Sequence, residues 1–411
     1  MDAEKNSLQS EDQSAAAAIH LPALDGVRGI AILLVLVFHL NLHVHFNRFA
    51  NRVPVDFLTR QFVEISDVGW IGVDLFFVLS GFLITGILID NRAATNFYRA
   101  FYARRALRIF PLYFAFLGAL LIVLPLFVPI STPGYSSAAH NQWYLWAYCT
   151  NIGLARGIDF GPFNHFWSLA VEEHFYLFWP VLVRKLNSKR RVAACYFCIV
   201  AAFVTRVVLL KSGLLVAAGW LTPSRLDAFA FGALAAIAAR GAPGTWPVFA
   251  RRLLTGAIVL AAVLLVLSTL ESTAFDEVRQ STRYTFQAAA FAYIIFLAAT
   301  HHARSRLVRA LSIRPLRLLG KYSYALYVLH FPLMPALYTI MMRGVLRIGN
   351  WARPSELAIM LIFDAFGIVT TLAVAMGSWY LFEKHFLKLK PPFLIPRPRP
   401  VAARTTLVVP S

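Results

Sequence analysis

A cation and an imidazole occupy one face of the first apolar segment. Arg28 and His39 lie eleven residues apart in LPALDGVRGIAILLVLVFHL, and only Gly, Ala and aliphatic or aromatic residues separate them. Eleven steps of about 100° make three turns plus about 20°, so in a helix both side chains share one face, about 16 Å apart. Imidazole is the side chain best suited to accepting a proton near pH 7. Alone, His39 could merely fix helix packing and Arg28 could extend to lipid headgroups, but together on one face they favour function.

The composition indicates the environment in which this pair lies. Hydrophobic residues make up 59% of the 411 residues, charged residues 14%, and the mean hydropathy is +0.63. These values exclude an ordinary soluble domain and predict an all-α, polytopic membrane protein that contacts the lipid bilayer. A net charge of +19 does not predict nucleic-acid binding, because the basic residues stand in short segments between long apolar runs. The positive-inside rule accounts for that distribution.

Apolar stretches of about 20 residues predict about ten transmembrane helices. They lie near residues 24–44, 68–89, 109–130, 166–183, 192–211, 225–240, 252–270, 284–300, 322–342 and 357–380. A further apolar segment, residues 143–154, is too short to cross a hydrocarbon core of about 30 Å and is expected to be re-entrant or interfacial.

Basic loops orient these spans. The cluster from Arg92 to Arg108 and the one from Arg184 to Arg191 are expected in the cytoplasm, which requires that residues 143–154 do not cross. Both termini are then cytoplasmic. The last outer loop, with Arg343, Arg347 and Arg353, departs from the rule.

The ends divide the chain into three parts. Residues 1–20 are polar and lack the apolar region of a signal peptide, so we expect a flexible cytoplasmic segment. Residues 21–386 form the membrane domain, and residues 387–411 form a flexible tail rich in Pro and basic residues. Three cysteines, Cys149, Cys195 and Cys198, cannot form a disulfide framework, and core packing is favoured over a metal site.

Ionisable residues inside other spans are further candidates, since charge at the bilayer centre costs about 2.5 to 3.5 kcal/mol on insertion scales. Ser80 is expected to bond a carbonyl of its own helix. Glu172 and Glu173 point about 100° apart, so at most one is expected to face a given pocket. Arg225 and Asp227 suit an ion pair about as well as a substrate contact. The remaining candidates are Asp74, Arg105, Arg108, Trp167, Lys321, Ser323, Tyr324 and His330. His330 is expected at the depth of His39.

The order of these motifs resembles the acyltransferase 3 family of bacterial membrane O-acyltransferases. The resemblance runs from about Leu21 to about Phe386. It rests on a basic residue and a histidine separated by ten residues, followed in order by FFVLSGFL, RRALRIFP, WSLAVEEHFY, SRLD and SYALYVLH. One departure is Glu383-Lys384-His385, where the family tends to have Glu-x-Pro; it leaves the role of Glu383 open.

The resemblance implies transfer of an acyl group, commonly acetyl, from acyl-CoA to a hydroxyl of a carbohydrate or other envelope or secreted acceptor, in the bacterial cytoplasmic (inner) membrane. Acetyl-CoA would be a co-substrate, with no bound cofactor or metal. Matched residue by residue, the catalytic group is His39, Arg28 and Glu172. The donor-binding group is Arg105, Arg108, Lys321, Ser323 and Tyr324, and the acceptor-side group is Asp74, Trp167, Arg225, Asp227 and His330.

Two interpretations remain for the chemistry of His39. As a general base it would remove the proton of the acceptor hydroxyl; an acyl-histidine intermediate is less favoured. A transporter or flippase of a lipid-linked glycan, with His and Glu relaying protons, is the alternative function. The lack of an inverted repeat and the motif order both count against it. Oligomeric state and acceptor identity do not follow from the sequence.

Overall fold

Helices make up the part of the chain that the structure describes, and no strand occurs there. The computed structural model describes residues 21–51, 56–127, 132–269, 275–301, 305–348 and 355–389, without the side chains of residues 42–51, 267–269, 341–342 and 344–348. The predicted N-terminal segment and most of the predicted tail lie outside these ranges. So do Arg353 and the side chain of Arg347.

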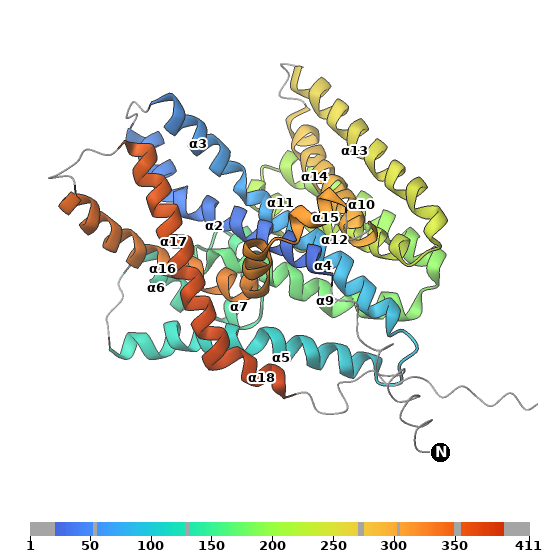
Figure 1. The fold of residues 1–411 in the computed structure, drawn as a ribbon, viewed down its shortest axis with the longest axis horizontal. Helices are drawn as coiled ribbons and strands as arrows, with labels where there is room; N and C mark the ends of the chain where they lie inside the picture. The colour runs from blue at the N-terminus through green and yellow to red at the C-terminus, as the bar shows by residue number, and fades with distance from the viewer. Residues whose placement is uncertain are drawn as a thin grey trace, which may run out of the picture.

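In the described residues, helical elements coincide with each of the ten predicted spans, and η2 and η3 continue α5 as far as Leu126 (Figure 1). These helices are α2 Pro22–Asn51, α4 Ile71–Asp90, α5 Phe97–Gly118, α9 Trp167–Lys185, α10 Ser188–Lys211, α12 Thr222–Ala239, α13 Trp246–Thr269, α14 Asp276–Thr300, α16 Arg314–Ile348 and α17 Glu356–Ser378. Short elements join or extend them: α3 Phe57–Asp67, η1 Val68–Trp70, η2 Ala119–Val123, η3 Leu124–Leu126, α6 Pro133–His140, α7 Trp143–Trp146, α8 Thr150–Ala155, η4 Gly161–Phe166, α11 Leu215–Trp220, η5 Pro243–Thr245, α15 Arg306–Leu311, η7 Trp379–Glu383 and α18 Lys384–Lys388.

Six of the described helical segments are long and apolar enough to cross a membrane. They contain α2, α4, α5, α10, α13 and α17. The other four predicted spans, α9, α12, α14 and α16, are helices whose ionisable, Tyr, His and Pro residues make them less apolar. The chain is therefore a multi-pass membrane protein. The number of spans and the side on which the termini lie stay predictions.

The segment 143–154 does not form a crossing helix. It folds into α7 and α8, of four and six residues, separated by Tyr148 in a left-handed conformation (φ 53°). Helices α5 and α9, before and after it, are antiparallel: Tyr102 contacts Leu177, whereas Tyr113 contacts Phe166. A crossing between two such helices would make them parallel, so the structure confirms the expectation drawn from charge.

Glycines fix how α2 packs on α16. A side chain at Gly29 would overlap the Leu316 carbonyl, and one at Gly320 would overlap the Asp25 carbonyl. Only glycine permits so close an approach of two backbones. The two helices are parallel, and ten residues beyond these contacts His39 of α2 meets His330 of α16. The expectation that both histidines lie at one depth is confirmed.

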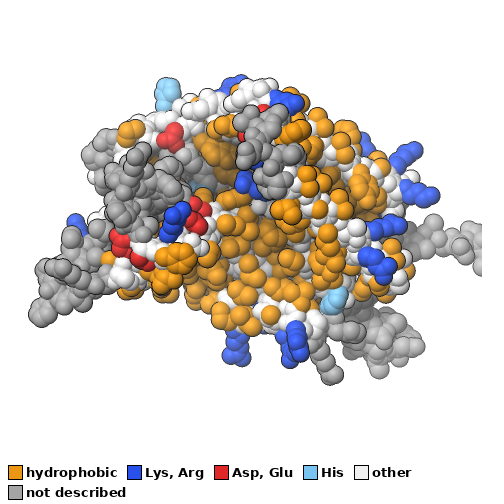
Figure 2. Space-filling model, turned by 90° about the horizontal axis from the view of Figure 1, so that it is seen from above, with side chains coloured by type: hydrophobic (Ala, Val, Ile, Leu, Met, Phe, Trp, Pro, Cys, Tyr) orange, Lys and Arg blue, Asp and Glu red, His pale blue; other side chains and the backbone are white. Residues whose placement is uncertain are grey.

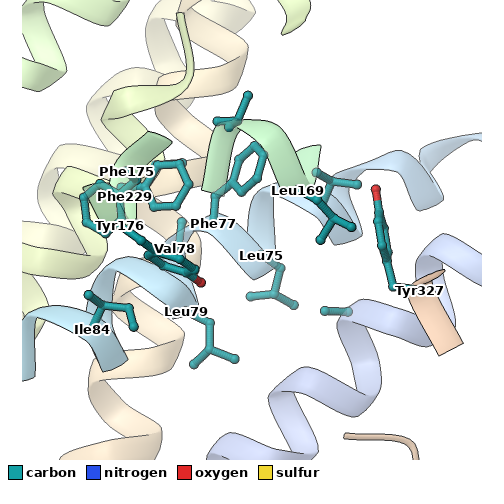
Figure 3. Close-up of a cluster of buried hydrophobic side chains, with 14 of the residues drawn as sticks. Leu75, Phe77, Val78, Leu79, Ile84, Leu169, Phe175, Tyr176, Phe229 and Tyr327 are labelled. Carbon is teal, nitrogen blue, oxygen red and sulfur yellow. The ribbon is translucent and has the colours of Figure 1, made fainter. Parts of the chain in front are cut away.

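A second pair, α4 and α12, is held in the same way around the aromatic core. Side chains at Gly81 and Gly232 would overlap carbonyl oxygens of the opposite helix. Above them the ring of Phe229 stacks on Phe77 and Phe175, at centroid distances of 4.8 and 4.4 Å. Figure 3 shows this stack beside Tyr176, with Tyr327 approaching Leu169 from α16. The close packing holds α4, α9 and α12 in a fixed register.

The outer helices carry the apolar surface. Phe197 of α10 is 73% exposed, and Val200 and Ile258 are similarly open. Figure 1 places α13 at one edge of the molecule and α5 along the opposite edge. Figure 2 shows a broad apolar field on one face with Lys and Arg around its border. Such a surface suits lipid, and most of the ionisable candidates lie inside the bundle instead, whereas Arg108 and Lys321 are exposed.

Candidate active site

A charged cavity lies between α2, α4, α5, α9 and α16. Its cavity volume is about 100 Å³. Polar and charged side chains from all five helices line it: Arg28, Ser80, Arg105, Arg108, Ser168, Glu172, Glu173, Tyr176, Ser323, Tyr324 and Tyr327. The sequence-predicted residues Arg28, Arg105, Arg108, Glu172, Ser323 and Tyr324 are thus brought together. We call this space the charged cavity.

Glu172 is held in the charged cavity by a hydrogen-bonded chain. The Ser80 hydroxyl donates to Oε1 of Glu172 at 2.6 Å, and the Tyr176 hydroxyl donates to Ser80 at 3.3 Å. The Arg105 guanidinium lies 5.5 Å from the centre of the Tyr176 ring. Ser80 therefore bonds another helix rather than its own, and the expectation for it was wrong. The reason is that a carboxylate oxygen of α9 lies within reach, and a carboxylate is a stronger acceptor than a carbonyl already bonded within its own helix.

Glu173 lines the same cavity as Glu172, which corrects the expectation that only one of them would. Two side chains about 100° apart on a helix cannot both face one flat surface, but the charged cavity extends around α9, so both carboxylates line it. Glu172 also lies among the cations of α2 and α5 rather than apart from them, so acidic and basic groups share one space.

Three cations dominate the charge of the cavity. Arg28 donates to Oδ1 of Asp25 at 3.2 Å, one turn earlier on α2. Arg105 and Arg108 come from α5, and the Tyr324 hydroxyl ties α16 to α5 by donating to the Ile109 carbonyl at 2.6 Å. Guanidinium groups that line a cavity can bind a phosphate group or stabilise an oxyanion that forms during a reaction.

Lys321 lies in an adjoining hollow instead of the charged cavity. This hollow has a cavity volume of about 470 Å³ and shares Arg28, Arg108 and Tyr324 with the charged cavity, so the two spaces adjoin. Glu383 lines it too, buried in the η7 turn and accepting a hydrogen bond from Ser378 at 3.0 Å. The residues that the sequence predicts to bind the donor therefore line two adjoining spaces.

His39 belongs to a cluster of three histidines. Its Nδ1 lies 3.3 Å from Nε2 of His330, and the ring of His165 packs against His330 with centroids 5.1 Å apart. His165 and His330 are buried, and neither ring nitrogen of His165 has a hydrogen-bond partner in the part of the chain that the structure describes. Sequence analysis missed His165 because it precedes the predicted span at 166. Its position two residues before the Trp167 motif was the available signal.

The hydrogen bonds determine which nitrogen of His39 can accept a proton. Nδ1 of His39 lies 2.8 Å from the Val35 carbonyl, and Nδ1 of His330 lies 2.8 Å from the Tyr327 carbonyl. A carbonyl only accepts, so each neutral ring carries its proton on Nδ1. Nε2 of His39 is then unprotonated and basic. Nε2 of His330 faces Nδ1 of His39, where it would accept a hydrogen bond from the imidazolium.

Tyr327 and Ser168 separate the charged cavity from the histidine cluster. Both line the cavity, and the Tyr327 ring lies 5.4 Å from His165 and 5.6 Å from His330 by centroids. The Tyr327 hydroxyl donates to the His165 carbonyl at 2.6 Å and lies 2.5 Å from Ser168 Oγ. Arg28 and His39 thus face two neighbouring regions that share one wall.

Three of the four remaining acceptor-side candidates lie in buried ion pairs. Arg225 pairs with Asp74, and its guanidinium stacks 4.4 Å from the Tyr284 ring centre. Asp227 pairs with Arg206 of α10 at 2.6 Å, a partner that sequence analysis missed because Arg206 stands near the end of an apolar span. Trp167 packs against Phe77 and Trp220. None of these four candidates lines the charged cavity, and their role at the acceptor stays a prediction.

Cysteine and metal chemistry gain no support from the described residues. Cys195 and Cys198 are buried in α10, and Cys149 is partly buried; all three are free thiols. Among the residues that the structure describes, no three His, Cys, Asp or Glu side chains are arranged to hold a metal ion.

Comparison with known proteins matches this arrangement to a family. Residues 21–380 match the family model described as "Acyltransferase domain" of acyltransferase 3. Curated relatives include the O-acetyltransferase OatA of Staphylococcus aureus (27% identical, 77% of this chain, 51% of the relative) and the putative peptidoglycan O-acetyltransferase YrhL of Bacillus subtilis (29%, 89% and 54%). The peptidoglycan O-acetyltransferase OatA of Listeria monocytogenes is 27% identical over 77% of this chain and 49% of its own length.

The chain spans about half the length of these curated relatives. No solved structure matches it. The family model nevertheless covers the helices that carry the charged cavity and the histidine cluster, from α2 to the beginning of η7. The chain therefore belongs to the acyltransferase 3 family.

Proposed function

We propose that this protein is a membrane O-acetyltransferase that moves an acetyl group from acetyl-CoA to a hydroxyl of a cell-envelope carbohydrate. The relatives' names, which describe O-acetyltransferases and in two cases peptidoglycan as the acceptor, support the reaction class. The charged cavity is the observation that carries the proposal. Tyr327 and Ser168 form one of its walls, and this wall borders the histidine cluster that contains His39.

The chemical step assigns His39 as the general base. Nε2 of His39 removes the acceptor's hydroxyl proton while the hydroxyl oxygen forms a bond to the thioester carbonyl carbon. The C–S bond breaks, and the departing CoA sulfur takes the proton from His39 and leaves as the thiol. General base catalysis of this kind contributes about 10² to 10⁴-fold in rate. His330 accepts from Nδ1 of the transient imidazolium and holds the ring in one orientation.

The charged cavity supplies binding and electrostatics for the donor. Arg28, Arg105 and Arg108 oppose the negative charge that grows on the thioester oxygen. Glu172 and Glu173 keep this set of cations from being fully unpaired in a buried space. Ser80 fixes the Glu172 carboxylate through the hydrogen bond at 2.6 Å.

The proposal is tested with purified protein in nanodiscs, acetyl-CoA and soluble peptidoglycan fragments. We expect release of CoA thiol in equal amount to acetylated fragment, detected by thiol reagent and by mass spectrometry. His39→Gln, which keeps a polar side chain of similar size, should abolish both products.

Two outcomes would overturn the proposal. Protein that binds the fragments but never consumes acetyl-CoA is not the enzyme described above. Protein that moves a lipid-linked glycan across liposomes without consuming the thioester would support the transporter alternative.

A further inference from the structure

The hollow beside the charged cavity has a charge pattern that the proposed chemistry does not require. Asp25, Arg28, Arg108, Arg317, Gly320, Lys321, Tyr322, Tyr324, Ala325, Trp379, Glu383 and Leu387 line it. We call it the basic vestibule. Arg317 and Lys321 are exposed and one turn apart on α16, so both project from the same face. They stand outside the charged cavity, where they cannot touch the reacting atoms.

The two carboxylates of the vestibule each accept a hydrogen bond within the protein, whereas neither cation is paired with a carboxylate. Asp25 accepts from Arg28, and Glu383 accepts from Ser378 within the η7 turn. In the part of the chain that the structure describes, neither Arg317 nor Lys321 forms an ion pair with a carboxylate. The vestibule therefore presents positive charge that can bind an anion of its own.

An aromatic ring lies beside the cations. The Lys321 ammonium is 5.8 Å from the ring centre of Trp379 and 5.0 Å from that of Tyr322. Trp379 begins η7, a π-helical turn at the end of α17, and Glu383 ends it. Such turns are rare and occur often at functional sites. Here the turn brings both Trp379 and Glu383 to the vestibule.

The basic vestibule has cations, an aromatic ring and a position beside the charged cavity. Together these features favour one class of ligand. Phosphoryl groups suit Arg317 and Lys321, and a purine base suits the face of an indole, on which it can stack. A lipid headgroup shares the phosphate chemistry but lacks the base. The hollow, with a cavity volume of about 470 Å³, falls in the range of ligand pockets, about 300 to 1,000 Å³.

We infer that the basic vestibule is the nucleotide subsite for the acyl-CoA donor. Arg317 and Lys321 bind the phosphates, Trp379 stacks on the adenine, and the pantetheine arm passes Arg28, Arg108 and Tyr324 into the charged cavity. This inference rests on the proposed function. It adds Arg317 and Trp379 to the donor-binding residues, and it assigns Lys321, already predicted among them, to the phosphates.

The test compares two donors that differ only in the nucleotide. Arg317→Gln with Lys321→Gln, and separately Trp379→Leu, are assayed with acetyl-CoA and with acetyl-pantetheine. We expect the KM for acetyl-CoA to rise at least tenfold with kcat within twofold of wild type, and the KM for acetyl-pantetheine to stay unchanged. Arg314→Gln is the matched control, since Arg314 is an exposed cation one turn before Arg317 that does not line the vestibule.

The kinetic outcomes separate this inference from the proposed function. Wild-type protein that consumes acetyl-CoA, with the variants unaffected or impaired equally for both donors, overturns the vestibule assignment and leaves the function standing. If no thioester is consumed, the proposed function fails, and calorimetry with adenosine 3′,5′-bisphosphate tests the subsite directly. Binding that is lost in the double variant supports it.

Nanodiscs with and without anionic lipid distinguish the source of the phosphate. No binding of adenosine 3′,5′-bisphosphate in either nanodisc, together with retention of anionic lipid by the wild type but not by the double variant, would show a headgroup site and overturn the inference. Unchanged nucleotide affinity in both lipids supports it. Because Arg317 and Lys321 are exposed, the double variant should elute from size exclusion as wild type does.

Discussion

The charged cavity and the ion-pair region around Arg206 both bury charge within the same helical bundle, yet they are built differently. In the ion-pair region Arg206 is fully buried and donates to Asp227 at 2.6 Å and to Thr285 at 2.8 Å. Thr285 in turn donates to Asp227 at 3.2 Å, which closes the network. In the charged cavity, Arg28, Arg105 and Arg108 border empty space and outnumber the carboxylates Glu172 and Glu173.

This difference qualifies the rule that an intramembrane charge marks function. Arg225, Asp227 and Asp74 satisfied that rule from sequence, but each has a buried ionic partner on another helix. Their pairing ties α10, α12 and α4 together. A charged side chain that lines a cavity can still bind a ligand. One in a closed hydrogen-bond network is already bound to its partners and stabilises helix packing instead. The two regions therefore predict opposite responses to substitution.

The largest effect is expected at the histidine cluster. His39→Ala removes the proposed base and should lower kcat for acetyl transfer by about 10³ to 10⁴-fold, at the upper part of the range for general base catalysis. Thermal unfolding followed by intrinsic fluorescence should change little, because His39 is only partly buried. His330→Asn should lower activity less, since it removes a hydrogen bond to the base and leaves the base in place. Equal losses in both variants would contradict the assigned roles.

The next effect is on stability and belongs to the ion-pair region. Asp227→Ala leaves the Arg206 guanidinium buried without its carboxylate, which costs about 3 to 5 kcal/mol when one partner of a buried pair is removed. We expect a lower unfolding temperature in detergent and reduced yield. Activity per folded molecule should be retained.

Replacing both partners provides the control for Asp227. Arg206→Met with Asp227→Leu removes both charges and should recover much of the lost stability, because apolar side chains of similar volume replace a buried pair with little cost. A stable Asp227→Ala protein without transferase activity would instead support the predicted role of Asp227 on the acceptor side.

Glu172→Gln tests the cavity without changing its shape. We expect kcat/KM to fall about 10²-fold, the cost of losing one preorganised electrostatic group at a reacting centre. The free energy of unfolding should not decrease. Glu173→Gln is the matched control on the next residue, and we expect a smaller loss because Ser80 donates to Glu172. A larger loss at Glu173 would reverse the assignment.

The sequence predicted helices and the main polar groups well, for physical reasons. Ten apolar segments became helices because backbone groups in lipid must bond internally. The spacing of Arg28 and His39 predicted a shared helix face, and charge predicted that residues 143–154 do not cross. These conclusions rely on local periodicity or on counting charges, which a single chain contains.

What the sequence could not predict depends on contacts between helices. The pairing of Arg225 with Asp74, rather than with its neighbour Asp227, follows from the register of α4 against α12. The joint exposure of Glu172 and Glu173 follows from the shape of a cavity formed by five helices. His165 joined the histidine cluster only because η4 packs on α16. The distances between helices depend on close contacts made by glycines, and one sequence does not show which helix each glycine contacts.

A smaller effect is expected at Ser80. Ser80→Ala removes the hydrogen bond to the Glu172 carboxylate, and a bond to a charged group contributes about 1.5 to 3 kcal/mol. Because Tyr176 lies nearby and can take over part of this bond, we expect kcat/KM to fall about tenfold, near the lower bound. The control is Ser212→Ala, an exposed serine that bonds only the Val208 carbonyl of its own helix. Both variants are measured in the acetyl-CoA assay, and equal activities would remove Ser80 from the site.

The smallest effect is expected at a pair that copies the geometry of the ion-pair region on the surface. Arg240 donates to both carboxylate oxygens of Asp90 at 2.6 Å, the distance found between Arg206 and Asp227. The side chains are 30% and 55% exposed, against 0% and 3% in the buried pair. Exposed pairs contribute about 0.2 to 1 kcal/mol and weaken with salt. Asp90→Asn should therefore shift the unfolding temperature slightly, and the shift should disappear in 1 M NaCl, whereas that of Asp227→Ala should persist. A large, salt-independent loss at Asp90 would show that the short contact distance, and not burial, determines how much such a pair stabilises the protein.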